Sequence, residues 1–154
     1  MMKVFKAYYV SPIGPLEVSG TEDGILSVSF VKRRRPNDRN LPECLKEGIR
    51  QLEEYFKGIR KSFSLKLLMQ GTPFQKLVWQ GLKKIPFGKT VSYGDLARTV
   101  GKPKAYRAVG NANNKNPMAI IIPCHRVIGS DGSLVGYGSG LWRKEWLLKH
   151  EKIL

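Results

Sequence analysis

Cysteine and histidine are both scarce in this 154-residue chain, with two of each. The two cysteines, Cys44 and Cys124, cannot build a disulfide framework, and the two histidines do not complete a plausible zinc site with them. We therefore expect free thiols, no bound metal and no cofactor. Free thiols are typical of proteins that work in a reducing compartment.

Long apolar runs are also absent. No segment approaches the roughly 18 consecutive apolar residues of a membrane span, and the N-terminal MMKVFKAYYV lacks the apolar core of a signal peptide. These absences predict a protein of the cytoplasm, or of the nucleus if the cell has one, that does not associate with membranes.

Acidic residues are few relative to basic ones, with 12 Asp and Glu against 27 Lys and Arg, for a net charge of +15. Residues 1–70 carry 13 basic and 8 acidic groups, whereas residues 71–154 carry 14 and only 4. Such an excess favours a polyanionic partner, bound mainly by the second half of the chain. General solubility or thermal adaptation is the alternative explanation.

The first half of the chain has the pattern of a small antiparallel sheet followed by a helix. The first 31 residues contain three β-rich runs separated by turn sequences. The charged segment 32–40 reads as a loop, most simply a solvated one, although it could contact phosphate. A helix should open at Pro42 and close at Gly58, with Cys44 as a structural residue in its first turn. Alternation in residues 62–67 predicts one more strand. The predicted apolar face of the helix consists of Leu45, Ile49, Leu52 and Phe56.

Helices dominate the prediction after a boundary near Gly71. Thr72 followed by Gln75, and Ser92 followed by Asp95, are N-terminal capping patterns. The first of these helices should pack its apolar side inward, with Trp79 as a core residue. Its predicted apolar face consists of Phe74, Leu77, Val78 and Leu82.

Two short helices joined at Gly101, within residues 92–112, match helix-turn-helix geometry. An apolar strand at 118–122, a glycine-rich loop at 132–140 and a closing helix from Leu141 should follow. The predicted fold is α/β with two lobes. Residues 1–70 form the small antiparallel sheet with its helix, and residues 71–154 form a mostly helical, winged-helix-like lobe.

The sequence Cys124-His125-Arg126 follows the apolar run directly and contains a reactive thiol. Neighbouring cations can favour the thiolate. A Cys–His acyl-transfer site is one interpretation, but adjacent residues of an extended strand point to opposite faces, and acyl transfer has no need of such a positive charge. A soft thiolate beside DNA-binding helices suits attack on a saturated alkyl carbon whose leaving group is a nucleobase oxygen. The thioether formed has no easy hydrolysis step, so the protein would be consumed.

Five motifs in order strengthen this interpretation: GTPFQKLVW, IPFGKTVSYGDLA, AYRAVGNANNKNP, PCHRV and GYGSGLWRKEWLLKHE. Together they resemble the O6-alkylguanine-DNA alkyltransferases, also called methylated-DNA–protein-cysteine methyltransferases. The resemblance is close over residues 71–151 and extends to the N-terminal region in outline.

The resemblance implies a catalytic group. Cys124 corresponds to the alkyl acceptor, His125 to a base that acts through a water, and Glu151 to the acid that orients His125. Asn116 corresponds to a hinge asparagine between the helix pair and the reactive segment. Tyr93 corresponds to a tyrosine that rotates the target nucleotide and donates a proton to N3 of guanine, and Lys144 assists it electrostatically.

The resemblance also implies a DNA-binding surface and a substrate pocket. Arg107 corresponds to an arginine finger that fills the gap left by the flipped base, on a helix that enters the minor groove. Other expected DNA-binding residues are Lys104, Ala105, Ala108 and Gly110, and the pocket should be formed by Val127, Tyr137 and Gly138. Some relatives place a serine at the position of Gly138, so the range of adducts accepted is open.

The sequence therefore predicts a monomeric DNA-repair protein. It would transfer a methyl or larger alkyl group from O6-alkylguanine, and from O4-alkylthymine, in double-stranded DNA to Cys124 in a single turnover. A non-catalytic damage sensor on the same scaffold is the alternative. A winged-helix transcription factor would explain the charge and the helix pair but not the PCHRV motif with a downstream glutamate.

Overall fold

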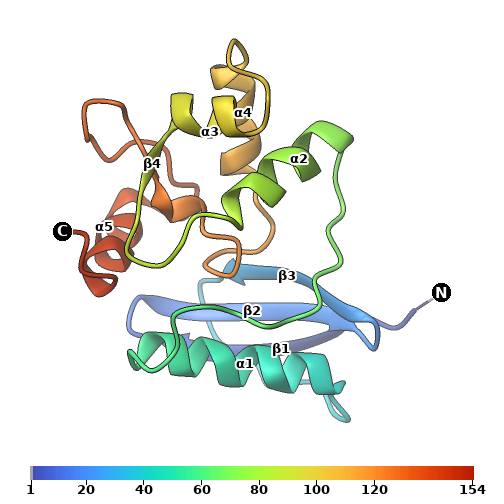
Figure 1. Cartoon of the computed structure of the whole chain (residues 1–154). Coiled ribbons are helices and arrows are strands. Elements are labelled where there is room, and N and C mark those ends of the chain that lie inside the picture. Colours follow the sequence, from blue (N-terminus) through green and yellow to red (C-terminus); the bar gives the residue numbers. More distant parts are fainter. Residues whose placement is uncertain (1) are drawn as a thin grey trace. The chain divides into compact units, whose positions relative to one another are not determined.

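The computed structural model describes residues 2–154, which divide into two compact units (Figure 1). The N-terminal unit contains the residues up to Gln70 together with Pro117–Ile121. The C-terminal unit contains Gly71–Asn116 and Ile122–Leu154. A short apolar segment from late in the sequence thus belongs to the N-terminal unit.

A three-stranded antiparallel sheet with one helix on its face forms the N-terminal unit. The strands β1 (Phe5–Ser11), β2 (Gly14–Thr21) and β3 (Gly24–Phe30) lie in the order β1-β2-β3, and α1 (Glu43–Phe56) runs along the sheet (Figure 1). The predicted sheet and helix are confirmed. Fully buried side chains of the shared core come from both layers: Ala7, Leu16, Val18, Ile25, Leu45, Leu52 and Tyr55.

A β-bulge at Ser19/Gly20 shifts the register between β2 and β3. A Cβ on Gly20 would lie 2.5 Å from the carbonyl oxygen of Gly24 and 2.8 Å from Cδ1 of Leu45. Only glycine therefore allows α1 to pack this closely on the bulge. Cys44, in the first turn of α1, donates from Sγ to the carbonyl oxygen of Thr21 at 3.1 Å, which agrees with its predicted structural role.

Two further strands were expected from the sequence, over 62–67 and 118–122, and both predictions are wrong. Each segment instead makes one isolated bridge to the outer edge of β3, through Leu67 and through Met118. After Met118 the chain turns at Ile120, whose φ of 71° lies in the left-handed region. The apolar run reflects burial of a turn rather than an extended strand, which periodicity alone cannot distinguish.

Four helices and a short parallel strand pair form the C-terminal unit. The helices are α2 (Pro73–Leu82), α3 (Tyr93–Thr99), α4 (Tyr106–Asn114) and α5 (Leu141–His150). The strands β4 (Val91–Ser92) and β5 (Val127–Ile128) pair in parallel. Both predicted capping boxes are formed, Thr72 with Gln75 and Ser92 with Asp95, so the side chains of these residues satisfy free N–H groups at the starts of α2 and α3.

The core of the C-terminal unit centres on the inner side of α2. Trp79 is buried, and its indole N–H donates to the carbonyl oxygen of Ala112 in α4 at 2.9 Å, which confirms it as a core residue. Val78 and Leu82 are fully buried as predicted. Leu77 is 39% exposed, so its assignment to the apolar face is wrong: it points away from the side of α2 that meets α3 and α4.

Within residues 2–154, no helix combines the length and the apolar character needed to cross a membrane.

Candidate active site

Cys124 opens a single turn of 3-10 helix, η1 (Cys124–Arg126), instead of ending a strand. Its thiol is buried, with 7% of the residue exposed. In η1 the chain is coiled, so the expectation that Cys124 and His125 point to opposite faces of an extended segment does not apply. No direct hydrogen bond between the two side chains is present among the described residues.

His125 is fixed by a carboxylate from the end of α5. Its Nε2 lies 2.7 Å from Oε2 of Glu151, the C-cap residue of α5, and both side chains are completely buried. Nδ1 on the opposite edge of the ring has no hydrogen-bond partner within residues 2–154. One ring nitrogen is therefore engaged and the other is available to exchange a proton.

Arg126 holds the same carboxylate from a second direction. Its Nε and Nη2 donate to the two oxygens of Glu151 at 2.8 and 3.0 Å, and its Nη1 donates to the carbonyl oxygen of Ile85 at 2.7 Å. The backbone N–H of Gly88 adds a further contact to Oε1 at 3.3 Å. This bidentate pair fixes Glu151 in position and balances its charge inside the protein.

Burial and hydrogen bonding together set the protonation states of His125 and Glu151. Burial lowers the pKa of His125 below its usual value of 6.5, although the carboxylate of Glu151 opposes the shift, so the imidazole is neutral near pH 7. Burial alone would raise the pKa of Glu151, but hydrogen bonds from His125 and Arg126 hold that pKa well below its ordinary value. The resting pair is a neutral imidazole beside an ionised carboxylate.

The thiol itself is not activated at rest. Burial raises the pKa of Cys124, and the hydrogen bond from Asn116 and the charge of Lys144 offset the rise only in part. The expectation that neighbouring cations favour the thiolate is therefore wrong for the resting protein. Arg126 is turned toward Glu151, and desolvation outweighs the remaining positive charge. Such a thiol needs a base before it can act as a nucleophile.

Asn116 links the end of α4 to the reactive turn. Its side-chain amide donates to the carbonyl oxygen of Ile122 at 2.7 Å, and it also hydrogen-bonds the thiol of Cys124. Its backbone N–H donates to the carbonyl oxygen of Asn113 at 3.3 Å. Asn116 therefore connects the end of α4 to the segment that carries Cys124.

Tyr93 and Lys144 meet at the glycine-rich loop. The Tyr93 hydroxyl donates to the carbonyl oxygens of Val135 and Gly136 at 3.0 and 3.3 Å. The buried Nζ of Lys144 donates to the carbonyl oxygens of Val127 and Val135 at 2.5 and 2.7 Å, and it lies 5.9 Å from the centre of the Tyr93 ring. Burial lowers the pKa of Lys144 to about 8. The two side chains thus share the carbonyl of Val135.

The expected pocket residues come from β5 and from the glycine-rich loop. Burial raises the pKa values of both Tyr93 and Tyr137, and an ionised Cys124 would add to each rise. The hydroxyl of Tyr137 is buried without a hydrogen-bond partner among the described residues. Val127 is buried in β5, and a Cβ on Gly138 would make an ordinary contact, 3.5 Å from the carbonyl oxygen of Asn114.

The expected DNA-binding residues lie at the start of α4 and in the turn before it. Arg107 is exposed, and no ion pair or hydrogen bond engages its guanidinium within residues 2–154. Lys104 and Ala108 are exposed, and Ala105 is half-buried. Gly110 instead faces the Tyr93 ring, where a Cβ would lie 3.5 Å from Cδ1, so its small size serves the packing of α3 on α4.

Sequence reasoning missed two parts of the site. In the sequence, Arg126 stands out only as a neighbour of the Cys124 thiol. Its pairing with Glu151 depends on where α5 ends in space, which the sequence does not show. The buried amide of Asn113, which lies near the Tyr93 hydroxyl, had no recognisable signal in the sequence. Within residues 2–154, no group of three or more His, Cys, Asp and Glu side chains could hold a metal ion.

Comparison with known proteins accounts for this arrangement. Two family models match the chain. The 6-O-methylguanine DNA methyltransferase, ribonuclease-like domain, matches residues 4–69, and the 6-O-methylguanine DNA methyltransferase, DNA binding domain, matches residues 73–153.

Relatives and solved structures agree with these matches. The methylated-DNA–protein-cysteine methyltransferase of Methanosarcina acetivorans is 51% identical, over 96% of this chain and 98% of the relative. The crystal structure of Mycobacterium tuberculosis O6-methylguanine methyltransferase has a TM-score of 0.87 at 42% identity, over 97% and 93% of the two chains. A structure of M. tuberculosis OGT in complex with DNA has a TM-score of 0.85 at 43% identity, over 94% and 91%. The chain therefore belongs to the 6-O-methylguanine DNA methyltransferase family, as its five motifs predict.

Proposed function

We propose that this chain repairs alkylated DNA by transferring the alkyl group of O6-alkylguanine irreversibly to Sγ of its own Cys124. The observation that carries the proposal is the buried Cys124 thiol next to a buried His125–Glu151 pair, in a chain of this family. The name shared by its relatives and the solved DNA complex of a relative support alkyl transfer and DNA as the partner.

The transfer begins with removal of the thiol proton. His125 accepts this proton on Nδ1 through a bridging water, while Glu151 stabilises the imidazolium through Nε2. The thiolate attacks the alkyl carbon, a sulfur–carbon bond forms, and the carbon–O6 bond breaks with its electron pair leaving on the guanine. A proton from Tyr93 to N3 neutralises the departing base. The thioether has no base-assisted route back, so each molecule reacts once.

Entry of the base requires Tyr93 to change partners. Its hydroxyl donates to the carbonyl oxygens of Val135 and Gly136, and it must leave these acceptors to donate to guanine. Lys144 donates to the same carbonyls, so it keeps the loop in place when Tyr93 turns to the substrate. Lys144 thereby assists Tyr93 by positioning the loop as well as through its charge.

Residues 71–154 act as the DNA-binding and alkyl-acceptor domain in this proposal, and residues 1–70 as a supporting domain. Arg107, exposed and without a hydrogen bond or ion pair to any of residues 2–154, is suited to fill the space left by a flipped nucleotide from the minor groove. Because its reactive thiol must stay reduced, we place the protein in the cytoplasm.

Mass spectrometry tests the proposal directly. The intact protein is mixed with excess duplex that contains one O6-methylguanine, and the peptides are then mapped. We expect one added methyl group per molecule, on the peptide that contains Cys124, and no further increase with time. Cys124→Ala should bind the same duplex and gain no mass. Tight binding without any mass change in the natural chain would instead identify a damage sensor.

A further inference from the structure

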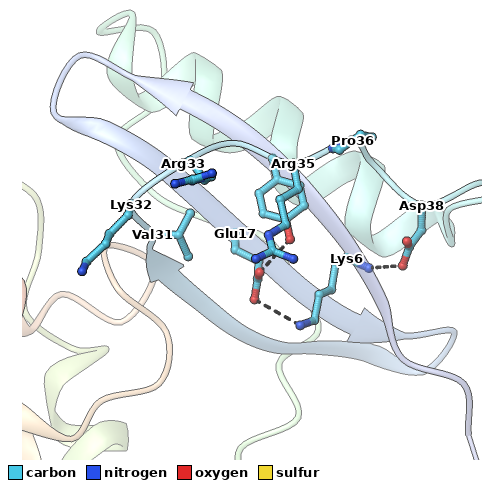
Figure 2. A pocket seen from close by; sticks show the side chains of 9 residues that line it. Lys6, Glu17, Val31, Lys32, Arg33, Arg35, Pro36 and Asp38 are labelled. Atoms are coloured by element: carbon cyan, nitrogen blue, oxygen red, sulfur yellow. Dashed lines mark hydrogen bonds and ion pairs between the residues drawn. The ribbon is translucent and has the colours of Figure 1, made fainter.

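A cavity of about 740 Å³ lies in the N-terminal unit, and none of its lining residues belongs to the alkyl-transfer site (Figure 2). It is lined by β1, β2 and the segment that follows β3. Four of its lining residues are cationic: Lys6, Lys32, Arg33 and Arg35. The sequence suggested only a solvated charged loop at 32–40, so the cavity is new information.

The carboxylates at this cavity are already engaged. Glu17 accepts a hydrogen bond from the Tyr8 hydroxyl at 2.7 Å. Glu17 also pairs with Lys6 at 3.8 Å (Figure 2). Asp38 accepts from the backbone N–H of Lys6 at 2.8 Å. By contrast, no carboxylate within residues 2–154 forms an ion pair with Lys32, Arg33 or Arg35. The four cations and two carboxylates that line the cavity leave a positive surplus, a net charge of +2, carried by side chains outside any ion pair of the described residues.

The segment that carries the surplus is tied down at both ends. At its start, the N–H of Val31 donates to the carbonyl oxygen of Pro15 at 2.9 Å. At its end, Asp38 exchanges two hydrogen bonds with the backbone of Lys6, and the side chain of Asn37 accepts from the N–H of Tyr8 at 2.8 Å. Because β1 is an edge strand, these bonds also occupy its free edge. The backbone that carries the cations is thus held in place, which lowers the entropic cost of binding a ligand.

The order of the residues along the segment fits a binding site. Arg33 and Arg35 line the cavity, whereas Arg34 between them does not. Lys32, Arg33 and Arg35 therefore line one cavity, where a single ligand could contact all three. Arginine presents a planar fork of donors that suits phosphate oxygens.

We propose that this cavity binds phosphates of the DNA backbone, as a second electrostatic contact outside the C-terminal unit. This inference rests on the proposed function, because DNA is the polyanion that the chain must find. A surplus spread over three side chains suits successive phosphates of one strand better than a single small anion. The contact would read no sequence and would add affinity that depends strongly on salt.

The salt dependence of binding to a long undamaged duplex tests the proposal. The cavity variant is Lys32→Gln, Arg33→Gln and Arg35→Gln together. The control carries Arg34→Gln, Lys46→Gln and Lys66→Gln, which removes equal charge from exposed positions of the same unit that do not line the cavity. In the cavity variant, the slope of the logarithm of the binding constant against the logarithm of the salt concentration should become shallower by about 2 to 3. Each phosphate contact contributes roughly 0.9 to this slope, and the variant removes three cations. The control should keep the natural slope.

Single substitutions sharpen the assignment. Arg33→Gln and Arg34→Gln change the net charge identically at adjacent positions, so a long-range effect would be equal in both. A contact at the cavity predicts a shallower slope for Arg33→Gln alone. Matching unfolding midpoints by circular dichroism establish that the variants fold, as expected for side chains without ion pairs.

Two readouts separate failure of this inference from failure of the proposed function. Transfer from free O6-methylguanine base involves no phosphate, and it should be equal in the natural chain and in both triple variants. If transfer occurs but the cavity and control variants share one slope, the inference is overturned and the function stands. If the natural chain transfers no alkyl group, the function fails whatever the slopes are. Saturable binding of inorganic pyrophosphate that the cavity variant loses, with an unchanged DNA slope, would also overturn the DNA assignment.

Discussion

Two clusters of ionic side chains, one in each unit, use the same residue types in opposite surroundings. On α1, Arg50 pairs with Glu47 and Glu54 while half of its side chain remains in solvent. In the C-terminal unit, Arg126 pairs with Glu151 beside His125, and all three side chains are buried. We refer to these as the α1 cluster and the buried cluster.

The difference shows what each cluster is for. Exposed ion pairs gain little because water competes for both partners. Buried charges cost several kcal/mol of hydration and are retained only where their partners are well placed. Arg126 donates to both oxygens of Glu151, including the Oε2 that contacts His125, so the carboxylate stays ionised while the imidazole stays neutral and able to accept a proton. The buried cluster is therefore built for proton transfer, and the α1 cluster for a hydrated surface.

The largest expected effect comes from removing one buried partner. Arg126→Met leaves the Glu151 carboxylate buried without its bidentate donor, and it should lower the free energy of unfolding by about 3 to 5 kcal/mol. Urea denaturation measures the loss. Arg50→Met, the matched change in the α1 cluster, should leave the unfolding midpoint unchanged within error. Equal losses in the two variants would contradict the comparison.

Next in size is a kinetic effect of Glu151. Glu151→Gln keeps the shape of the side chain but removes the charge that stabilises the imidazolium of His125. Transfer to Cys124 should slow by about 100-fold. Quenched time courses, followed by the mass of the Cys124 peptide, measure the rate, while affinity for undamaged duplex serves as the control. A rate within threefold of the natural chain, roughly 0.7 kcal/mol, would remove Glu151 from the mechanism.

A smaller effect is expected on stability at acid pH. The unfolded chain protonates its histidines near pH 6.5 and its glutamates near 4.5, whereas folded His125 and Glu151 both have lowered pKa values. The unfolded state thus binds more protons as the pH falls, first below 6.5 and again below 4.5, so stability must fall in both steps. Each step should appear as a fall in the free energy of unfolding as the pH is lowered.

Denaturation at a series of pH values measures these steps, and Glu151→Gln should abolish the lower one. In the α1 cluster, the Arg50 hydrogen bond lowers the pKa of Glu47 to about 2, but this carboxylate is in solvent and should contribute little. A lower step that persists in Glu151→Gln would assign it to the surface instead.

The smallest of these effects concerns an exposed arginine outside both clusters. Arg107→Ala should slow repair of a duplex lesion by about tenfold, because part of the cost of base flipping, a few kcal/mol, is no longer offset. Reaction with free O6-methylguanine should be unchanged. Parallel single-turnover assays on the two substrates measure the ratio, and equal losses on both would exclude the finger role.

The sequence anticipated elements whose signals are local. Both capping boxes, the hairpin turns and the burial of Trp79 follow from residues a few positions apart. The apolar segment after Pro117 was misjudged because a buried turn and a buried strand share the same composition.

The site was anticipated by resemblance more than by physics. Nothing near Glu151 in the sequence indicates that Arg126, 25 positions earlier, will bind it, since that contact depends on how α5 returns to η1. The raised pKa of Cys124 could not be predicted from the sequence either. The residues next to Cys124 in the sequence show which charges are nearby, but not how deeply the thiol is buried.

The segment Pro117–Ile121 has a consequence for modularity. The chain leaves the C-terminal unit after Asn116, spends five residues in the N-terminal unit, and returns at Ile122, two residues before the reactive thiol. Met118 and Ile120 are buried in the N-terminal unit. Dividing the chain after Gln70 would therefore separate these two side chains from the unit in which they pack. The two units are interleaved in the sequence, so neither could be exchanged for a foreign domain as a single uninterrupted cassette.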